Sequence, residues 1–356
     1  MRNLSESEAY VIQTLIGASP VTERALIQQC HLPRSTFQYV RRRLYAREWL
    51  HDRYVPHPRV TGVRFATAEV LWPFAARRAA DLQRLQSDPQ TVVAWSSPNV
   101  IFYVRLTAES PPATDSLASS PPRARSLRMT CPATAEGVPV YFDASGPLAV
   151  LFGLTRPRSY PLRIRELDPP PGDNGEERPV SPDRIRAAAD LVAASERRRD
   201  FHLLGRSVPP FPLGLPRNQA QLVADGFVQW RVLPDLGRLP SFRGRILHDF
   251  VFVHGTLIRK TTGTRLLEEI VSECGVYPYL AMVDGDRTGD VLLAFLAVGQ
   301  GTERSRSLGR KTSVQAFFED RLHAITIVRE SMQWLRPVID HRYEGLMSHT
   351  GTNRAE

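Results

Sequence analysis

The chain has few cysteines, almost no lysine and no long apolar segment. Its 356 residues include 3 cysteines, and the wide spacing of Cys30, Cys131 and Cys274 excludes a disulfide framework and a zinc site with paired ligands. No apolar run approaches the roughly 20 residues that a membrane-spanning helix needs, and the amino terminus lacks an apolar signal core. We therefore expect a cytoplasmic protein without a metal site or a cofactor.

Positive charge is abundant and comes almost entirely from arginine. The formal net charge is +9, and the only lysines are Lys260 and Lys311. Such a charge favours a polyanionic partner. Because an excess of arginine, alanine and proline also accompanies a GC-rich genome, the position of an arginine cluster is more informative than the arginine count. The length leaves room for two or three domains.

The densest arginine cluster lies in segment 32–50, whose pattern predicts a helix with one apolar face and one basic face. Phe37, Val40 and Leu44 recur at helical spacing. Ser35 is a candidate N-cap for this helix. A helix of this kind can pack inward through its apolar face while its basic face enters a DNA groove.

The surrounding segments complete the pattern of a winged helix-turn-helix. Ser5 and Glu8 match a capping box that starts a first helix. A second short helix is predicted over 23–30, and the basic, proline-containing segment 51–59 predicts a hairpin or wing. Together these pieces predict a winged helix-turn-helix DNA-binding domain over residues 1–60.

The basic face of the third helix predicts contacts with double-stranded DNA. Guanidinium groups form paired hydrogen bonds with guanine and bind phosphate without losing their charge. The residues that we assign to DNA contacts are Arg34, Ser35, Thr36, Gln38, Tyr39, Arg41, Arg42, Arg43, Arg47, Arg53 and Arg59. A solvated face of an ordinary helical domain would explain the same charges, but the order of three helices favours DNA.

A short repeat indicates that the chain is duplicated. The segment 32–35 reads Leu-Pro-Arg-Ser, and the segment 215–218 reads Leu-Pro-Arg-Asn. Each copy precedes a helical pattern and then an extended segment that contains proline. Upstream of the second copy, Ser181 is a candidate cap and Pro182 the first residue of a further helix. We therefore predict a second, degenerate winged helix over 181–244.

A second type of domain is predicted after each winged helix. In the second half, the patterns predict strand 249–257, helix 264–274, strands 279–283 and 290–298, helix 311–322 and strand 324–330. This β-α-β-β-α-β order is that of a ferredoxin-like domain, whose two helices cover one face of a four-stranded antiparallel sheet. In the first half, strand 62–67, helix 70–85 and strands 91–95 and 99–104 repeat the first part of this order.

These patterns predict an α+β fold class, a winged helix-turn-helix plus a ferredoxin-like βαββαβ domain, duplicated within the chain. The predicted domains are the winged helix 1–60, a ferredoxin-like domain over 61–167, a linker over 168–180, the degenerate winged helix 181–244, a second ferredoxin-like domain over 245–340 and a tail over 341–356. Segment 107–125 is rich in serine and proline and predicts a mobile insertion. The apolar residues 148–152 would supply later structure.

This arrangement resembles the leucine-responsive regulator (Lrp/AsnC) family of transcription factors, here in tandem duplicate. Segment 283–293 resembles the Gly-x-x-Asp turn of that family, which borders a small-molecule effector pocket. The resemblance implies effector-binding roles for Gly285, Gly289 and Asp290, although Gly-Asp is also ordinary hairpin chemistry. The corresponding turn 96–99 lacks glycine and aspartate. The resemblance also implies either an internal pseudo-dimer or a homo-oligomer.

The main functional hypothesis is a sequence-specific transcription regulator that is not an enzyme, with double-stranded DNA and a small-molecule effector as partners. No nucleophile–base pair, glycine-rich phosphate loop or HExxH motif is present in the sequence. A plasmid or phage replication or partition protein is one alternative, and an interaction scaffold is another. A third alternative is a siroheme decarboxylase, because those enzymes also resemble this family; His248, His254 and Arg259 are then candidates to surround a tetrapyrrole carboxylate.

Overall fold

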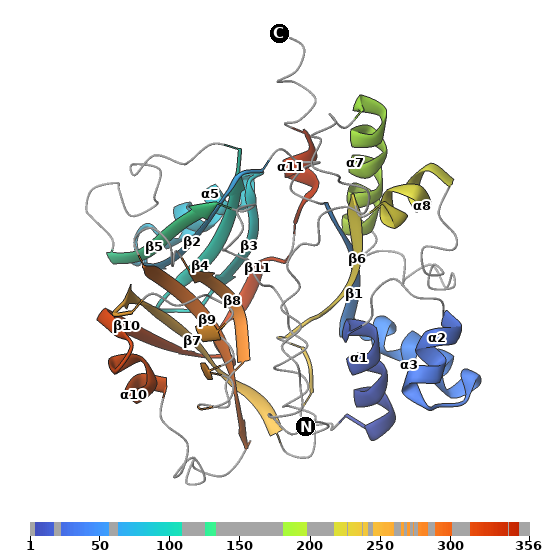
Figure 1. The fold of residues 1–356 in the computed structure, drawn as a ribbon, viewed down its shortest axis with the longest axis horizontal. Coiled ribbons are helices and arrows are strands. Elements are labelled where there is room, and N and C mark those ends of the chain that lie inside the picture. The colour runs from blue at the N-terminus through green and yellow to red at the C-terminus, as the bar shows by residue number, and fades with distance from the viewer. Residues whose placement is uncertain are drawn as a thin grey trace. The chain divides into compact units, whose positions relative to one another are not determined.

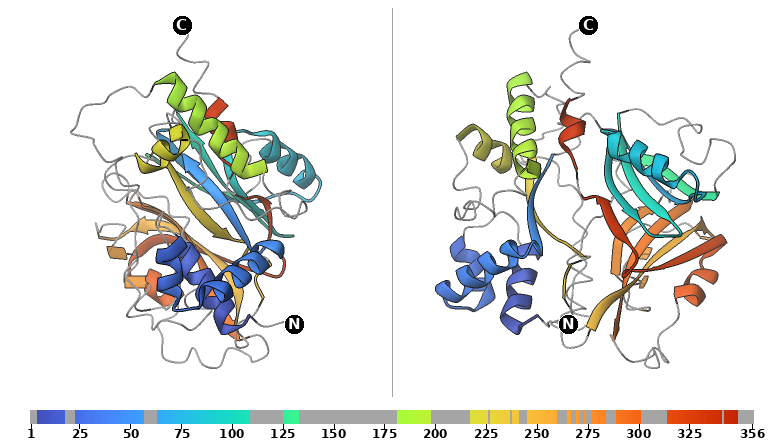
Figure 2. Two further views of the ribbon diagram at one scale, coloured as in Figure 1. Left: turned by 90° about the vertical axis from the view of Figure 1, so that its right-hand side faces the viewer. Right: turned by 180° about the vertical axis from the view of Figure 1, so that it is seen from behind.

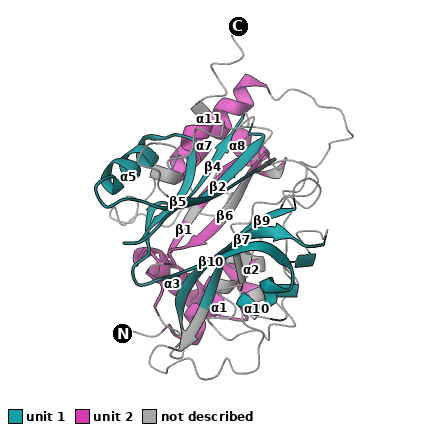
Figure 3. Cartoon of the chain, turned by 90° about the vertical axis from the view of Figure 1, so that its left-hand side faces the viewer, with its two compact units in different colours: residues 1, 63–166, 241–340 teal, residues 2–62, 167–240, 341–356 magenta. Residues whose placement is uncertain are grey.

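The structure is a computed structural model of the chain. It describes residues 4–17, 23–56, 63–108, 125–132, 181–197, 217–225, 227–236, 238–240, 245–259, 265–266, 269–270, 273, 277–283, 289–300, 314–340 and 342–348. The chain divides into two compact units, and each unit takes segments from both halves of the sequence (Figure 3). We call residues 2–62, 167–240 and 341–356 the winged-helix unit, and residues 63–166 and 241–340 the sheet unit.

The winged-helix unit begins with three helices, α1 (Glu6–Gly17), α2 (Glu23–Cys30) and α3 (Arg34–Ala46). The capping box of α1 is confirmed, since the Ser5 N–H donates to the Glu8 carboxylate over 2.8 Å and the Glu8 N–H donates to Ser5 Oγ over 3.2 Å. The prediction that Ser35 caps α3 is wrong. The helix already begins at Arg34, and no side chain caps it.

The second half contributes helices α7 (Pro182–Arg197) and α8 (Arg217–Ala224) to this unit, and the end of the chain contributes α11 (Glu344–Ser348) (Figure 1). The segment after α3 does not form a hairpin of its own within the described residues. Its strand β1 (Leu50–Pro56) pairs antiparallel with β6 (Val228–Pro234) of the second half. Each half offers one strand here, and the pairing satisfies the backbone groups through which the two strands face each other.

The second half of the sheet unit has the strand order β10-β7-β9-β8. These strands are β7 (Arg245–Leu257), β8 (Tyr277–Val283), β9 (Asp290–Gln300) and β10 (Leu322–Ser331). The order is that of a ferredoxin-like sheet, with the last strand beside the first. Helix α10 (Val314–Glu319) covers one face, and its Phe317 and Phe318 pack against Val253 and Leu293. The sheet therefore has the strand order of the predicted ferredoxin-like fold, while most of the predicted helix 264–274 lies outside the described residues.

The first half builds an equivalent sheet with the order β11-β3-β4-β2-β5. Its elements are β2 (Phe65–Trp72), α5 (Arg78–Ser87), β3 (Thr91–Ser96), β4 (Ile101–Thr107), β5 (Arg125–Pro132) and β11 (Arg336–Ile339). The predicted helix 70–85 is wrong at its start, because residues 70–72 complete β2 and the helix begins at Arg78. Strand β11 follows β10 in the sequence, so the second half donates an edge strand to the first sheet.

An aromatic layer joins the two sheets of this unit, which lie side by side in Figure 2. The ring centroids of Phe102 and Phe252 are 5.0 Å apart, and those of Trp95 and Phe250 are 6.1 Å apart. All four rings are buried. Each sheet thus has one face covered by helices and the other covered by the second sheet. The α+β fold class with duplicated domains is confirmed.

Several predictions concern residues outside the described part of the chain. They include most of the insertion 107–125, the apolar segment 148–152 and the linker 168–180. Within the described residues, no helix combines the length and the hydropathy that a membrane crossing would require.

Candidate functional site

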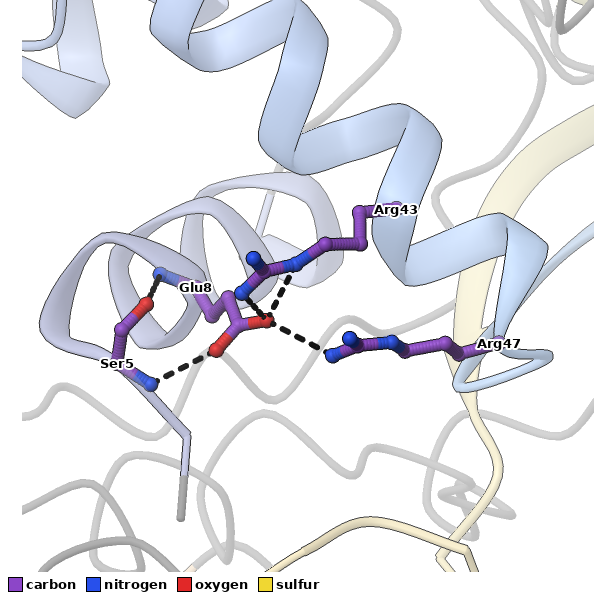
Figure 4. A network of polar contacts seen from close by, with 4 residues as sticks. All are labelled: Ser5, Glu8, Arg43 and Arg47. Carbon is purple, nitrogen blue, oxygen red and sulfur yellow. Dashed lines mark hydrogen bonds and ion pairs between the residues drawn. The ribbon is translucent and has the colours of Figure 1, made fainter. Parts of the chain in front are cut away.

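The basic face of α3 is partly used inside the winged-helix unit. Arg43 Nε donates to Glu8 Oε1 over 3.0 Å, and Arg47 Nη1 lies 3.4 Å from the same oxygen (Figure 4). The Glu8 side chain is only 1% exposed. Burial raises the pKa of Glu8, but hydrogen bonds from the Ser5 N–H and from Arg43 outweigh burial, and the pKa is lowered. Glu8 is therefore an ionised carboxylate that ties Arg43 of α3 and its C-cap residue Arg47 to α1.

Two further arginines assigned to DNA are buried. Arg41 is 9% exposed and Arg53 is 4% exposed. Arg53 Nη1 donates to the carbonyl of Ser195 over 3.3 Å, and Ser195 Oγ accepts the backbone N–H of Tyr54 over 3.2 Å. These contacts tie β1 to α7. The four arginines at positions 41, 43, 47 and 53 thus contribute to the packing of this unit.

The remaining residues assigned to DNA contacts show a smaller exposed surface than the sequence predicts. Residues Arg34, Ser35, Tyr39 and Arg42 are exposed, and Thr36 and Gln38 are half-buried. Arg59 lies outside the described residues. Among the described arginines that we assigned to DNA, only those at positions 34 and 42 are exposed. This is a weak cationic surface for a polyanion.

A second group of candidate residues meets in the sheet unit, at one end of β7 and β9. Phe250 and Phe252 of β7 point to the aromatic layer, and His254 and Thr256 follow on the same face because side chains alternate along a strand. Thr256 lies directly opposite Asp290 in the β7–β9 pairing. Thr256 Oγ1 donates to Asp290 Oδ1 over 2.8 Å. We call His254, Thr256 and Asp290 the β7–β9 site.

Gly289 shapes the start of β9 at this site. Its φ is +74°, a left-handed backbone conformation that residues with a side chain rarely adopt. Its carbonyl accepts the N–H of Leu257 over 2.7 Å, which fixes the turn against the end of β7. Gly289 and Asp290 were assigned to an effector turn, and the structure places them beside Thr256 and His254. Gly285, the third residue of that assignment, lies outside the described residues.

The environment of His254 favours its neutral form. The side chain is half-buried, and burial lowers its pKa, while the charge of Asp290 acts in the opposite direction. A neutral imidazole can accept a proton, donate one from its other nitrogen or bind a metal. The described residues contain no group of three or more histidine, cysteine, aspartate or glutamate side chains that could hold a metal ion. The site is suited to proton transfer.

The other two residues proposed for a tetrapyrrole site differ from His254 in exposure. His248 is exposed, and its Nδ1 lies 2.8 Å from Asp249 Oδ1. Arg259 is exposed two residues beyond the end of β7. Of these three residues, His254 alone is half-buried. Arg259 lies near the same end of the strand and offers a charge to an approaching anion.

The sequence did not indicate that the histidine and the glycine-aspartate turn belong to one site. His254 and Asp290 are separated by 35 residues of chain, and the pairing register of β7 and β9 brings them together. The signal that could have found this juxtaposition is the antiparallel pairing of the two predicted strands. When the end of β7 is aligned with the start of β9, Thr256 lies opposite Asp290, and His254 lies two residues away on the same face.

Comparison with known proteins gives two structural matches. No family model and no curated protein matches the chain. A crystal structure of the siroheme decarboxylase NirDL is similar, with a TM-score of 0.46, 10% sequence identity, and coverage of 99% of this chain and 100% of that chain. A crystal structure of NirDL in co-complex with an iron-uroporphyrin III analogue has a TM-score of 0.42, 12% identity, and coverage of 97% and 98%.

Two predictions from the sequence require correction. We predicted a DNA-binding transcription regulator and a chain without enzymatic activity, whereas both matched structures are of an enzyme. Both predictions are therefore wrong. The physical reason for the first error lies in α3, because an arginine-rich helix has the same sequence pattern whether its guanidinium groups face a groove or an internal carboxylate. Arg43 and Arg47 face Glu8.

Proposed function

We propose that the chain is an enzyme that decarboxylates a tetrapyrrole bearing carboxylate groups, with His254 at the reacting centre. The observation that carries the proposal is the position of His254, half-buried at the margin of the aromatic layer and beside the Thr256–Asp290 pair. The proposal takes its substrate class from the siroheme decarboxylase alternative, and its support comes from residues of this chain.

The chemistry of decarboxylation explains the choice of a histidine. When the bond between a carboxylate and its neighbouring carbon breaks, carbon dioxide leaves and the remaining carbon must receive a proton. Histidine is the side chain that exchanges protons most readily near neutral pH. His254 can pass a proton from solvent to that carbon, since it is partly exposed while Phe252 and Leu292 beside it are buried.

The neighbouring charges divide the work between binding and chemistry. Arg259 provides an exposed guanidinium at the end of β7, and guanidinium groups bind carboxylates through paired hydrogen bonds. The charge of Asp290 acts to raise the pKa of His254, which favours the imidazolium that forms when His254 takes up a proton. We therefore assign substrate binding to Arg259 and proton transfer to His254.

The test uses siroheme and iron-uroporphyrin III as probes with the purified full-length chain. Binding is followed by the visible absorbance of the tetrapyrrole, and turnover by the release of carbon dioxide. We expect the wild-type chain to bind siroheme and release carbon dioxide. His254→Ala should lower the release rate by about 10²-fold or more, because general acid–base groups contribute about that much.

His248→Ala is the matched control, because His248 lies on the same strand and is exposed. It should bind siroheme and turn it over like the wild type. The proposal is overturned if the wild-type chain binds neither tetrapyrrole, or if His254→Ala releases carbon dioxide at the wild-type rate.

A further inference from the structure

A buried carboxylate of the second half lies against a turn of the first half within the sheet unit. Glu330 of β10 is 7% exposed, and Ser97, which follows β3, is 1% exposed. Ser97 Oγ donates to Glu330 Oε2 over 2.8 Å, although 233 positions separate these residues in the sequence. A buried carboxylate costs free energy unless it is hydrogen-bonded or paired with a positive charge. The groups around Glu330 must therefore supply that compensation.

The hydroxyl of Ser97 is oriented by its own turn. The backbone N–H groups of Asn99 and Val100 donate to Ser97 Oγ over 3.2 and 3.1 Å, and the Ser97 N–H donates to the Val100 carbonyl over 2.9 Å. Because two donors occupy the lone pairs of this oxygen, its proton is directed away from the turn. That proton meets the carboxylate of Glu330.

Arg78 supplies positive charge at the same place. Its guanidinium donates to Ser96 Oγ and to the Ser97 carbonyl, and to the Pro98 carbonyl over 3.2 Å. Three acceptors on one turn fix the orientation of this side chain. Burial lowers the pKa of Arg78, and the charge of Glu330 opposes this effect. The Ser97 hydroxyl therefore contacts the carboxylate of Glu330, and Arg78 holds the turn that presents this hydroxyl.

We propose that Arg78 and the turn 96–100 form a carboxylate-binding site, which this chain fills with its own Glu330. The occupied site fastens β10 of the second sheet to the first sheet. The first sheet has no equivalent of Glu330, because β5, which occupies the edge that β10 occupies in the second sheet, contains no acidic residue. The ligand class of the site is a single carboxylate group, presented by a side chain or by a small acid.

This site is separate from the β7–β9 site. Glu330 lies opposite Phe250 in the β10–β7 pairing, and His254 is four residues further along β7. At about 3.3 Å per residue, four residues of strand span about 13 Å. A test of the carboxylate-binding site therefore does not depend on the proposed enzymatic activity.

The test is rescue of a vacated site by acetate. We expect Glu330→Ala to lower the unfolding temperature by about 5 °C, because it leaves the buried Ser97 hydroxyl without its acceptor. Acetate at roughly 0.1 to 0.5 M should restore part of this loss, relative to sodium chloride at equal ionic strength, because a ligand that binds only the folded chain stabilises it. The double variant Arg78→Ala/Glu330→Ala should lose the acetate response.

Glu319→Ala is the matched control, since Glu319 is an exposed carboxylate of α10 in the same unit. It should unfold near the wild-type temperature and show no specific response to acetate. The proposal is overturned if acetate stabilises Glu330→Ala no more than chloride does, or if the response persists when Arg78 is also removed.

A second measurement applies if Glu330→Ala does not fold. Glu330→Gln keeps an acceptor for the Ser97 hydroxyl but removes the negative charge that acts on Arg78. The unfolding temperatures of Glu330→Gln, Arg78→Ala and their combination then form a double-mutant cycle. Effects that are smaller in combination than their sum support the site, and strictly additive effects overturn it.

Discussion

The two sheets of the sheet unit share a strand order but place their buried polar groups on opposite faces. In the first sheet, Glu69 of β2 lies opposite Tyr103 of β4, and the Tyr103 hydroxyl donates to the Glu69 carboxylate. On the helix-covered face of the second sheet, Val253 lies opposite Leu293, and both belong to the apolar core under α10. The face covered by helices is therefore polar at this pair in one sheet and apolar in the other.

The opposite holds on the face between the sheets. In the first sheet, Val70 lies opposite Phe102 there, and both are buried. In the second sheet, His254 lies opposite Leu292 on the corresponding face. Because successive residues of a strand point to opposite faces, substitutions at neighbouring positions change the polarity of each face separately and leave the fold unaltered. Duplicated sheets can thus keep their architecture while their chemistry diverges.

The aromatic layer that both sheets share should show the largest effect on stability. Phe250 packs against Trp95, Phe102, Phe252 and Tyr279. We expect Phe250→Ala to lower the free energy of unfolding by about 3–5 kcal/mol, as for other buried phenylalanines. Chemical denaturation measures this change. Phe74→Ala, at an exposed phenylalanine, should change it by less than about 0.5 kcal/mol. Equal effects of the two variants would contradict the packing.

The polar pair of the first sheet gives the next largest effect. Burial and the neighbouring Glu69 carboxylate raise the pKa of Tyr103, so its hydroxyl stays protonated and remains a donor. Tyr103→Phe removes that donor from a carboxylate that is 0% exposed. We expect a loss of about 1–3 kcal/mol in chemical denaturation. Tyr39→Phe, at an exposed tyrosine of α3, is the control and should unfold like the wild type.

A smaller effect distinguishes α3 from α8. Helix α3 has 13 residues and is tied to α1 through Glu8, whereas α8 has 8 residues and lacks the arginine triplet. We expect Glu8→Gln to cost about 1–2 kcal/mol, because it weakens charge-assisted hydrogen bonds to two arginines. Glu6→Gln, two residues earlier on α1, is the matched substitution for comparison.

The pH dependence of that difference has a definite sign. The pKa of Glu8 is lowered in the folded chain, so its contribution is complete above the ordinary glutamate pKa and is lost as the pH falls through the folded value. The gap in stability between the wild type and Glu8→Gln should therefore narrow below about pH 4.5. A gap that stays constant down to pH 3 would show that Glu8 acts without its charge.

The smallest expected effect is the pH dependence of stability that comes from His254, on the face between the sheets. Burial lowers the pKa of His254, so folding favours the neutral imidazole and stability decreases as the pH falls through about 6.5 towards the folded value. The stability of the variant His254→Leu should depend less on pH over this range, because leucine, like Val70 in the first sheet, does not titrate. Thermal unfolding between pH 5 and 8 tests this, with His248→Leu as the exposed control.

Local patterns in the sequence predicted those elements whose signals lie within a few residues. The capping box at Ser5 and Glu8 and the strands β3, β8 and β9 follow from such signals. The predicted helix 70–85 failed at its start, because the apolar residues Val70 and Leu71 fit a strand face and a helix face equally well. The structure decides between them by pairing β2 with both β4 and β5.

The sequence by itself determined the class of fold, the duplication and the types of residue available for chemistry, because capping, alternation and helical spacing are local properties of the chain. Tertiary structure alone decided how those residues are used. It turned Arg43 and Arg47 towards Glu8, set Thr256 and Asp290 beside His254, and brought Glu330 to Ser97. The physical reason is that strand register and helix packing are settled by contacts between segments far apart in the chain, and such contacts leave no periodic signal in a single sequence.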